Sequence, residues 1–309
     1  MQPIRSLFRK LIPHKLLFLR RIIHNGRFFD HFNQIKQYKK DIKLKPADFP
    51  FYLSIIAVVK NEAPYIAEWI EYHLLVGVQK FFIYDNESSD NLKKCLEPYI
   101  INNIVEYIYF PGIRQQLNSY NDAIKRYRYK SFWLAFIDID EFLVPVSTET
   151  IAEFLRDFED VPGIEINQVI YGSGGNHKKT NGLVIERFKD HSNFDFFTNK
   201  TVKTIVNSRH IFYMTTVHIA EYFNGLFSVN SDKEKNILPS FHRTALHDKI
   251  RINHYCIKSL EEFTAKSDRG RAATPGKLTM DFFLERDRGE IKNDPIMDNF
   301  IEKIKVKFH

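Results

Sequence analysis

Three carboxylates stand close together in the segment AFIDIDEFLVP, residues 135–145. Asp138, Asp140 and Glu141 follow one apolar run and precede another, whereas a solvated loop would be flanked by Gly, Ser or Asn. Carboxylates in such surroundings require a positive partner. Two Asp side chains two residues apart can bind a hard divalent cation, which in turn can bridge nucleotide phosphates and stabilise a departing pyrophosphate.

An Asp-x-Asp tripeptide alone is weak evidence, because helix capping and surface charge produce it as readily. The position of this tripeptide after an apolar strand favours a binding site over capping or surface charge. The sequence contains no P-loop, His-Glu-x-x-His, Gly-x-Ser-x-Gly or Gly-x-Gly-x-x-Gly motif. A haloacid-dehalogenase-type phosphatase also begins with Asp-x-Asp, but it needs a small hydroxyl residue where this chain has Phe142 and usually carries the motif on its first strand.

The elements that position these carboxylates follow a regular alternation of patterns. Continuous apolar, β-branched runs predict buried strands, and apolar residues at helical spacing predict helices between them. The predicted strands are 51–59, 80–85, 104–110 and 132–139, and the predicted helices are 63–77, 88–100 and 114–129. Alternating strands and helices indicate an α/β, Rossmann-like, mostly parallel sheet flanked by helices.

Ligands bind such sheets at the carboxyl ends of the strands. The first predicted strand is followed by Lys60, Asn61 and Glu62, the second by Asp85, Asn86 and Glu87, and the fourth by the three carboxylates. Beyond residue 145 a helix is predicted over 150–160, a strand over 163–172 and a polar loop over 172–182.

Four separated segments carry a resemblance to a known family. They are VVKNEAPYIAEWIEYHLLVGVQKFFIYDNESSDN, QLNSYNDAI, WLAFIDIDEFLVP and INHYCIKSLEEFTAKSDRG, in this order between residues 52 and 270. Together they resemble the GT-A-fold glycosyltransferases of family 92 and the bacterial family 2-like group. The resemblance implies an inverting enzyme that moves a sugar from a nucleotide-sugar, usually a UDP-sugar, to a glycan or lipid-linked acceptor with Mn²⁺ or Mg²⁺.

The resemblance also implies roles for individual residues. Asp138 and Asp140 match the family's Asp-x-Asp and would bind the metal and the donor phosphates, with Asp140 at the reaction centre. His254 matches a C-terminal metal- or phosphate-binding histidine, although an ordinary core or surface histidine is the alternative. Lys266 and Arg269 fit a cluster that clamps the departing pyrophosphate, with plain surface charge on a helix as the alternative.

Further donor contacts are implied at the ends of the first two strands and on one helix. Capping and turn formation are the alternative for Asn61 and Asp85, and a solvated face is the alternative for the helix. The residues expected near the donor are Lys60, Asn61, Glu62, Asp85, Gln116, Tyr120, Asn121 and Asp122.

Inversion by direct displacement needs a carboxylate that takes the proton of the acceptor hydroxyl. Glu186 in GLVIERF is favoured slightly over Glu165 in GIEI, although either fits a strand-face residue paired with Lys or Arg. His177 and His218 are possible acceptor contacts, with core packing or simple exposure as the alternative.

The charge of the chain is uneven. Residues 1–45 contain twelve Lys or Arg and two Asp, a net charge of +10, so the rest of the +7 chain carries about −3. Lys15, Arg20 and Arg21 interrupt the apolar residues of this arm, so neither a membrane span nor a signal peptide is expected. The arm fits an amphipathic helix on an anionic membrane surface and, equally, a helix packed on the main domain.

The organisation predicted is a basic arm over 1–48, a catalytic domain over 49–270 and a helical extension over 271–309. Two cysteines in unrelated contexts, Cys95 and Cys256, give no disulfide framework and indicate a reducing, cytoplasmic location, possibly at the inner face of a membrane. No nucleic-acid-binding motif accompanies the basic arm.

Three functions therefore remain in contention. The first is a metal-dependent glycosyltransferase of surface polysaccharide or lipopolysaccharide synthesis. The second is a non-catalytic, membrane-peripheral or glycan-binding protein on the same fold, and the third is a metal-dependent phosphohydrolase.

Overall fold

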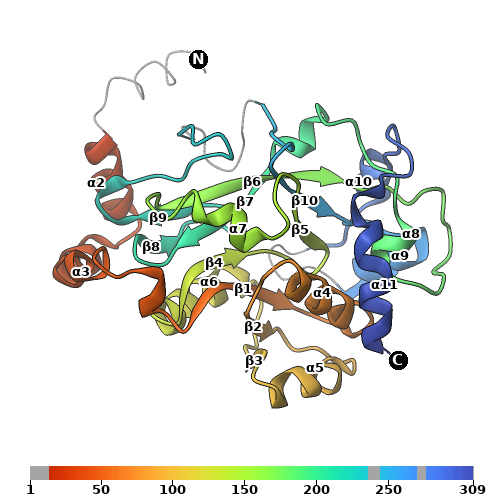
Figure 1. Ribbon diagram of the computed structural model, residues 1–309, viewed down its shortest axis with the longest axis horizontal. Coiled ribbons are helices and arrows are strands. Elements are labelled where there is room, and N and C mark those ends of the chain that lie inside the picture. The colour runs from red at the N-terminus through yellow and green to blue at the C-terminus, as the bar shows by residue number, and fades with distance from the viewer. Residues whose placement is uncertain (1–13, 236–243, 270–275, 309) are drawn as a thin grey trace.

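An eight-stranded mixed sheet forms the centre of the computed structural model, which describes residues 14–235, 244–269 and 276–308 (Figure 1). In spatial order its strands are β3 (Val105–Tyr109), β2 (Lys80–Asp85), β1 (Phe51–Val59), β4 (Ser131–Phe136), β7 (Val202–Asn207), β6 (Gly163–Ile170), β10 (Ile250–His254) and β5 (Glu141–Pro145). The first four run parallel, and β7 is antiparallel to both neighbours. The predicted mostly parallel α/β sheet is confirmed.

The first half of the chain follows the predicted alternation of strands and helices. The helices between its strands are α4 (Ala63–Leu75), α5 (Leu92–Ile101) and α6 (Gln116–Tyr127). The strand predicted over 132–139 ends at Phe136, and the segment EFLVP forms β5 at the far edge of the sheet. Closely spaced carboxylates are costly inside a buried sheet because they lose hydration. The chain therefore leaves β4 before Asp138 and forms a turn there.

Both faces of the parallel strands are covered, which explains their continuous apolar sequences. Leu53 and Ile55 of β1 pack with Trp69 of α4 on one face. Ile56 of the same strand packs with Tyr120 of α6 on the other. The alternation of side chains along a strand therefore fixes α4 and α6 on opposite sides of the sheet.

The second half of the chain completes the sheet and adds short elements around it. The predicted helix over 150–160 and the predicted strand over 163–172 correspond to α7 and β6, and the predicted polar loop separates β6 from α8. The remaining elements here are α7 (Ile151–Arg156), α8 (Val184–Arg187), β8 (Ile211–Met214), β9 (Ala220–Tyr222) and α9 (Leu260–Arg269). The 3-10 helices are η1 (Pro46–Asp48), η2 (Phe197–Lys200), η3 (Phe223–Gly225), η4 (Pro295–Met297) and η5 (Val306–Phe308).

The described part of the N-terminal arm forms α2 (His14–His24) and α3 (Phe28–Asp41), while residues 1–13 of the predicted arm lie outside the described residues. Phe18, Ile22 and Tyr38 are buried against Phe212 and Phe223. A buried ion pair of 3.0 Å between Asp41 and Arg128 joins α3 to the end of α6. The arm therefore packs on the main domain through one face.

Another face of the arm stays in solvent and is rich in apolar side chains. Phe29 and Phe32 of α3 are 76% and 71% exposed. The other exposed apolar side chains in the described part of the arm are Leu16, Leu19, Ile23, Phe28 and Ile42. None of the helices in the described ranges is long and apolar enough to cross a membrane.

The C-terminal extension lies along the domain, apart from residues 270–275, which are outside the described residues together with His309. Its helices are α10 (Met280–Arg286) and α11 (Asp298–Lys305). Figure 1 shows α11 beside α4 and α8. Ile301 and Ile304 enter the main core, and the Phe300 ring packs edge-on against Tyr72.

Candidate active site

The turn between β4 and β5 holds the three carboxylates in a fixed arrangement, and we call residues 137–141 the acid turn. The Asp138 N–H donates to Glu141 Oε2 at 2.9 Å, and the Glu141 N–H donates to the Asp138 carbonyl at 3.1 Å. The Tyr255 N–H, just after β10, donates to the Asp140 carbonyl at 2.8 Å. The acid turn is thus tied both to itself and to the opposite half of the sheet.

Lys203 of β7 supplies one of the positive charges that the acid turn requires. Its ammonium is 2.7 Å from Asp138 Oδ2 and 3.3 Å from Glu141 Oε2. Burial alone would lower the pKa of Lys203, but the two carboxylates raise it well above its ordinary value. Sequence reasoning missed this residue, and its signal was a single lysine inside the strand VKTIVN.

Lys266 of α9 supplies the second charge. Its ammonium donates to Asp140 Oδ2 and, at 2.8 Å, to the Cys256 carbonyl. Burial raises the pKa of Asp140, but the ammonium of Lys266 outweighs it and holds that pKa well below its ordinary value. The predicted contact of Lys266 with the phosphate region is therefore a contact with the acid turn in this structure.

The position of Lys266 depends on how α9 begins. Ser259 and Glu262 form a capping box, in which the Glu262 N–H donates to Ser259 Oγ at 3.3 Å and the Ser259 hydroxyl donates to Glu262 Oε2 at 2.6 Å. Arg187 adds a two-pronged contact to the same carboxylate at 2.8 and 2.9 Å. One turn later on the helix, Lys266 faces the acid turn.

His254 at the end of β10 is oriented by a chain of hydrogen bonds. The Gln168 amide donates to the Thr198 carbonyl at 2.9 Å, so its oxygen faces His254 and accepts from Nδ1 at 2.8 Å. The proton of the neutral ring therefore sits on Nδ1, and Nε2 presents a lone pair 3.6 Å from Asp140 Oδ1. Gln168 is a positioning residue that sequence reasoning missed.

A histidine lone pair and a carboxylate oxygen facing each other at 3.6 Å suit a shared cation. Mg²⁺ and similar ions are held by one or two protein ligands together with substrate phosphates and water. Over the described ranges, no three His, Cys, Asp or Glu side chains stand close enough together to hold a metal ion. Asp140 and His254 therefore fit a cation that shares its shell with a substrate, rather than one caged by protein.

Asp138 points to different partners. Its Oδ1 accepts from the Gln116 amide at 2.6 Å, and its Oδ2 is taken by Lys203. Tyr120, one helical turn beyond Gln116 in α6, accepts a second hydrogen bond from the same amide at 3.2 Å. The structure thus brings Gln116 and Tyr120 to the acid turn, as the donor-facing prediction requires.

Residues after β1 and β2 form a connected rim beside the acid turn. Asn61 has a left-handed backbone, with φ of 53°, and its side chain accepts from the Ser89 N–H at 2.7 Å. Asp85 accepts from Tyr107 at 2.6 Å and from the Ser88 N–H at 2.8 Å. Both therefore act as turn-forming residues here, at the sheet edge where a ligand is expected.

Arg269 closes this rim from α9. It donates to the Asn61 carbonyl and forms an ion pair with Glu62. A pocket of about 380 Å³ opens between these groups. Its lining residues are Asn61, Glu62, Pro64, Tyr65, Lys179, Ile257, Lys258, Glu261, Glu262, Ala265, Lys266 and Arg269. Lys60 is only half-buried at the end of β1, next to this rim.

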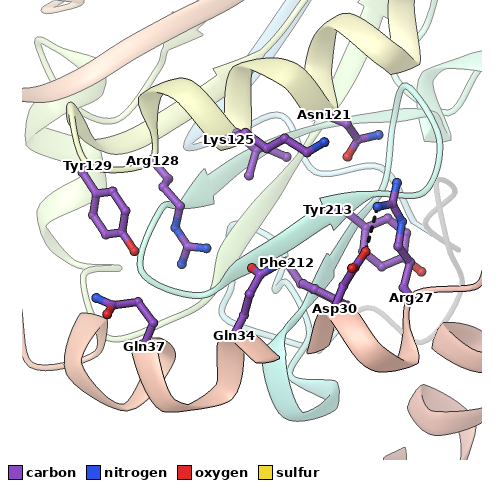
Figure 2. Close-up of a pocket in the computed structure, with 11 residues that line it drawn as sticks. Arg27, Asp30, Gln34, Gln37, Asn121, Lys125, Arg128, Tyr129, Phe212 and Tyr213 are labelled. Carbon is purple, nitrogen blue, oxygen red and sulfur yellow. Dashed lines mark hydrogen bonds and ion pairs between the residues drawn. The ribbon is translucent and has the colours of Figure 1, made fainter. Parts of the chain in front are cut away.

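Asn121 and Asp122 of α6 lie elsewhere. Asn121 exchanges hydrogen bonds with the backbone of Met214 in β8, at 2.8 and 3.1 Å. Figure 2 shows Asn121 at the wall of a different pocket, of about 370 Å³, between α6 and α3 of the arm. Asp122 pairs with Arg126 at 2.7 Å. Asn121 thus faces β8 and the arm, whereas Asp122 accepts from the Tyr84 hydroxyl of β2 at 2.9 Å.

The predicted acceptor-side residues are not gathered in one place. Glu186 of α8 forms a 2.6 Å ion pair with Lys305 of α11. Glu165 is buried in β6, where Ser228 donates to it. His177 is exposed in the loop before α8. No contact of the described structure joins any of these three to the acid turn.

His218 comes nearer to the acid turn. Its Nδ1 donates to the Val202 carbonyl at 2.9 Å, which leaves the lone pair on Nε2. Burial and then Lys203 lower the pKa of His218 to about 4, although Asp138 opposes them. A base that holds a proton so weakly suits a hydrogen bond to an acceptor hydroxyl better than removal of its proton.

Comparison with known proteins identifies the class to which this fold and site belong. A model of glycosyltransferase family 92 matches residues 53–279. The chain belongs to glycosyltransferase family 92, and the family predicted from the four sequence segments is confirmed. The matched range includes the acid turn, β10 and α9.

Similar proteins include two plant relatives. A glycosyltransferase family 92 protein of Oryza sativa subsp. japonica is 33% identical over 114 residues, which cover 36% of this chain and 19% of the relative. Galactan beta-1,4-galactosyltransferase GALS2 of Arabidopsis thaliana is 24% identical over 206 residues, which cover 62% of this chain and 36% of the relative. The chain thus spans a fifth to about a third of the length of these relatives.

Among solved structures, residues 1–349 of S. aureus TarS in complex with UDP are similar over 51% of this chain and 47% of that one. The identity is 14% and the TM-score is 0.35. A likeness at this level carries no argument about the fold or the chemistry of this chain.

Proposed function

We propose that this protein transfers a sugar from a UDP-sugar to a glycan or lipid-linked acceptor, with Mn²⁺ or Mg²⁺ at the acid turn. One observation carries the proposal: Asp140 and the lone pair of His254 converge at 3.6 Å beside a pocket lined by cations. A diphosphate brings negative charge that suits those cations, and it supplies the oxygens that a two-ligand metal site lacks.

The metal ion would be held by Asp140 and His254, and when bound it would neutralise negative charge on the leaving diphosphate. The protein supplies the rest of the electrostatics. Gln168 keeps the proton of His254 on Nδ1, so that Nε2 stays available. Gln116 and Lys203 hold Asp138 at the base of the turn, and Lys266 reaches Asp140 from the pocket side.

The proposed reaction is a direct displacement. The oxygen of an acceptor hydroxyl attacks the anomeric carbon of the donor sugar, and the bond from that carbon to the diphosphate breaks. The diphosphate leaves with the electron pair, and positively charged side chains around the pocket stabilise it. Glu186 remains the predicted base that receives the proton of the acceptor hydroxyl. In the structure its carboxylate forms an ion pair with Lys305.

UDP-galactose is the first donor to screen. Three relatives bear the name galactan beta-1,4-galactosyltransferase, and they are 24–30% identical to this chain over the matched segments. The acceptor is less defined, because the predicted acceptor-side residues are dispersed over the molecule.

Calorimetric titration of the full chain with UDP, with and without Mn²⁺, tests the nucleotide site. We expect Mn²⁺-dependent binding by the wild type and its loss in Asp140→Ala, because the variant removes one of the two proposed metal ligands. Asp232→Ala is the matched control, since it removes a partly exposed aspartate whose partner is Lys249. The control variant should bind UDP as the wild type does.

Two results would count against the proposal. If Asp140→Ala bound UDP with undiminished Mn²⁺ dependence, the acid turn would not be the metal site. If the wild type bound none of UDP, GDP and CDP, a non-catalytic protein on a glycosyltransferase fold would become the better account. Hydrolysis and transfer assays with UDP-galactose follow only from a positive titration.

We also propose that the arm binds an anionic membrane surface, which would bring the enzyme to a lipid-linked acceptor. Exposed Phe28, Phe29 and Phe32 share a side of α3 with exposed Lys36 and Lys39. Aromatic side chains flanked by lysines are typical of helices that lie in the headgroup region of anionic bilayers. The opposite side of α3 packs on the domain, so both sequence alternatives for the arm are compatible.

A pair of substitutions tests this surface without disturbing the packed face. Phe29→Ser/Phe32→Ser should weaken sedimentation with phosphatidylcholine–phosphatidylglycerol vesicles on the order of tenfold, because two exposed rings no longer insert. Ile101→Ser/Ile113→Ser is the control, since these side chains are 79% and 84% exposed but belong to α5 and the loop before α6. Equal sedimentation of the two double variants would show that the arm is not the membrane-binding surface.

A further inference from the structure

The pocket beside the acid turn contains a lysine whose placement needs an explanation. Lys258 lies in the turn between β10 and α9, where it is 5% exposed. Its backbone adopts the left-handed conformation, with φ of 56°, which is strained for a side chain with a Cβ. Two costs, burial of a charge and backbone strain, thus coincide at one residue that lines the pocket.

The other charged groups of the pocket wall mostly have partners of opposite charge. Lys266 pairs with Asp140, Arg269 with Glu62, and Glu262 with an arginine outside the pocket. Lys258 differs. Throughout the described part of the chain it has neither a hydrogen-bond acceptor nor an ion-pair partner, and its ammonium lies 4.3 Å from the centre of the Tyr65 ring.

A ring face compensates a buried ammonium only partly, because a cation–π contact is weaker than a charged hydrogen bond. Burial accordingly lowers the pKa of Lys258, although Glu62 opposes that shift. Glu62 also has an unsatisfied group, since Oε2 is buried without a hydrogen-bond donor among the described residues. The pocket therefore offers one cation, Lys258, whose hydrogen bonds a bound ligand would satisfy.

We propose that this pocket binds the diphosphate of a nucleoside diphosphate, with Lys258 as the principal cation that contacts a phosphate. The inference rests on the proposed transferase function and adds to it the residue that holds the leaving group. Lys266 and Arg269 would have to give up carboxylate partners to bind a phosphate, whereas Lys258 has all its hydrogen-bonding capacity left for a ligand.

The pocket's place in the sheet favours this ligand over an unrelated anion. It lies at the carboxyl end of β1, where open α/β sheets bind their ligands. Lys266 links its wall directly to the acid turn, so a phosphate beside Lys258 would lie between that turn and the rim formed by Asn61 and Glu62. The ring of Tyr65 keeps the ammonium of Lys258 in place while the ligand is absent.

Lys258→Met tests the assignment, because methionine keeps much of the apolar stem and removes the charge. Calorimetry of the full chain with inorganic pyrophosphate, UDP and uridine should show the two phosphate ligands bound about tenfold to a hundredfold more weakly. Uridine, which has no phosphate, should bind with unchanged affinity. Lys179→Met is the matched control, since Lys179 lines the same pocket but is exposed. It should change pyrophosphate affinity less than about threefold, because solvent and salt screen an exposed charge.

The folded state of the variant is checked by its melting temperature, which should equal or exceed that of the wild type because a buried charge without a partner is removed. Lys258→Gln provides a second variant if the methionine protein does not fold. Undiminished pyrophosphate and UDP binding by Lys258→Met, or an equal loss in Lys179→Met, would overturn the inference.

The same titrations separate this inference from the proposed function. A wild type that binds UDP, together with a Lys258 variant that binds it equally well, would overturn the role of Lys258 and leave the transferase proposal standing. A wild type that binds pyrophosphate in a Lys258-dependent way but no nucleotide would support the anion site and contradict the nucleotide-sugar donor. A wild type that binds neither pyrophosphate nor any nucleotide would contradict both proposals.

Discussion

The two aspartates of the acid turn are neutralised from two different kinds of element. Asp138 pairs with Lys203, which comes from β7 in the middle of the sheet and is 3% exposed. Asp140 pairs with Lys266, which comes from helix α9 at the edge of a pocket and is 22% exposed. The two aspartates lie two residues apart in one turn, but their lysine partners differ in exposure.

This difference in exposure indicates that Lys203 stabilises the fold of the acid turn, whereas Lys266 can also be reached by a ligand in the pocket. Lys203 is shared by Asp138 and Glu141 and is enclosed by the sheet, so it fixes the acid turn and has little capacity for a new partner. Lys266 lines the pocket and can exchange Asp140 for a phosphate without leaving its helix. Two similar Asp–Lys pairs in one turn can therefore have different roles, one in stability and one in ligand binding.

The largest effect is expected for Lys203→Met. Loss of this ammonium leaves the buried Glu141 and the partly exposed Asp138 without their main counter-charge, which should lower the free energy of unfolding by about 3–5 kcal/mol. Lys266→Met leaves one carboxylate, the buried Asp140, without its lysine, and should cost less, about 1–3 kcal/mol. Urea unfolding of the two variants measures both values.

The same pair of variants sharpens the comparison through binding. Lys266→Met should lose less stability than Lys203→Met but bind UDP more weakly, whereas Lys203→Met should show its defect first in unfolding. If both variants lost equal stability, the distinction between a structural and an exchangeable lysine would be wrong. If Lys266→Met bound UDP normally, the pocket side of the acid turn would not be the donor side.

Much of the first half of the fold was predictable because its patterns are local. The run 51–59 is apolar throughout and corresponds to β1, and KFFIYD corresponds to β2. The prediction for 132–139 ran the strand past Asp138 and placed the carboxylates at its end, whereas β4 ends at Phe136. Asp138 is neutralised by Lys203, which is distant in the sequence, and no local sequence pattern shows that contact.

The same limit applies to the candidate site. Asp140, His254, Lys266 and Arg269 lie in or next to motifs and were predicted, and the structure brings them to one edge of the sheet. Lys203 and Gln168 reach the site from strands far along the chain, so their contacts become visible only when the sheet is assembled. Asn121 was predicted from the family resemblance to share a donor-facing helix side with Gln116, but the helix turns that side chain towards β8.

The third expected effect concerns the element that carries Lys266, and it depends on pH. Burial raises the pKa of Glu262, but hydrogen bonds from Arg187 and Ser259 outweigh it and lower that pKa to about 2. A carboxyl whose folded pKa lies below its ordinary value stabilises the fold above that ordinary value. The contribution is lost as the pH falls through 4.5 towards 2.

Glu262→Gln isolates this contribution, because glutamine resembles the protonated carboxyl in shape. The variant should be less stable than the wild type by about 3 kcal/mol at pH 7, and the difference should shrink as the pH falls towards 2. Urea unfolding of both proteins between pH 7 and pH 3 measures the difference, and other carboxylates cancel because both proteins carry them. Curves that stay parallel would show that Glu262 does not fix α9 through its charge. Converging curves would show that the Lys266 side of the acid turn depends on a helix cap that acid removes, whereas Lys203 is held by the sheet itself.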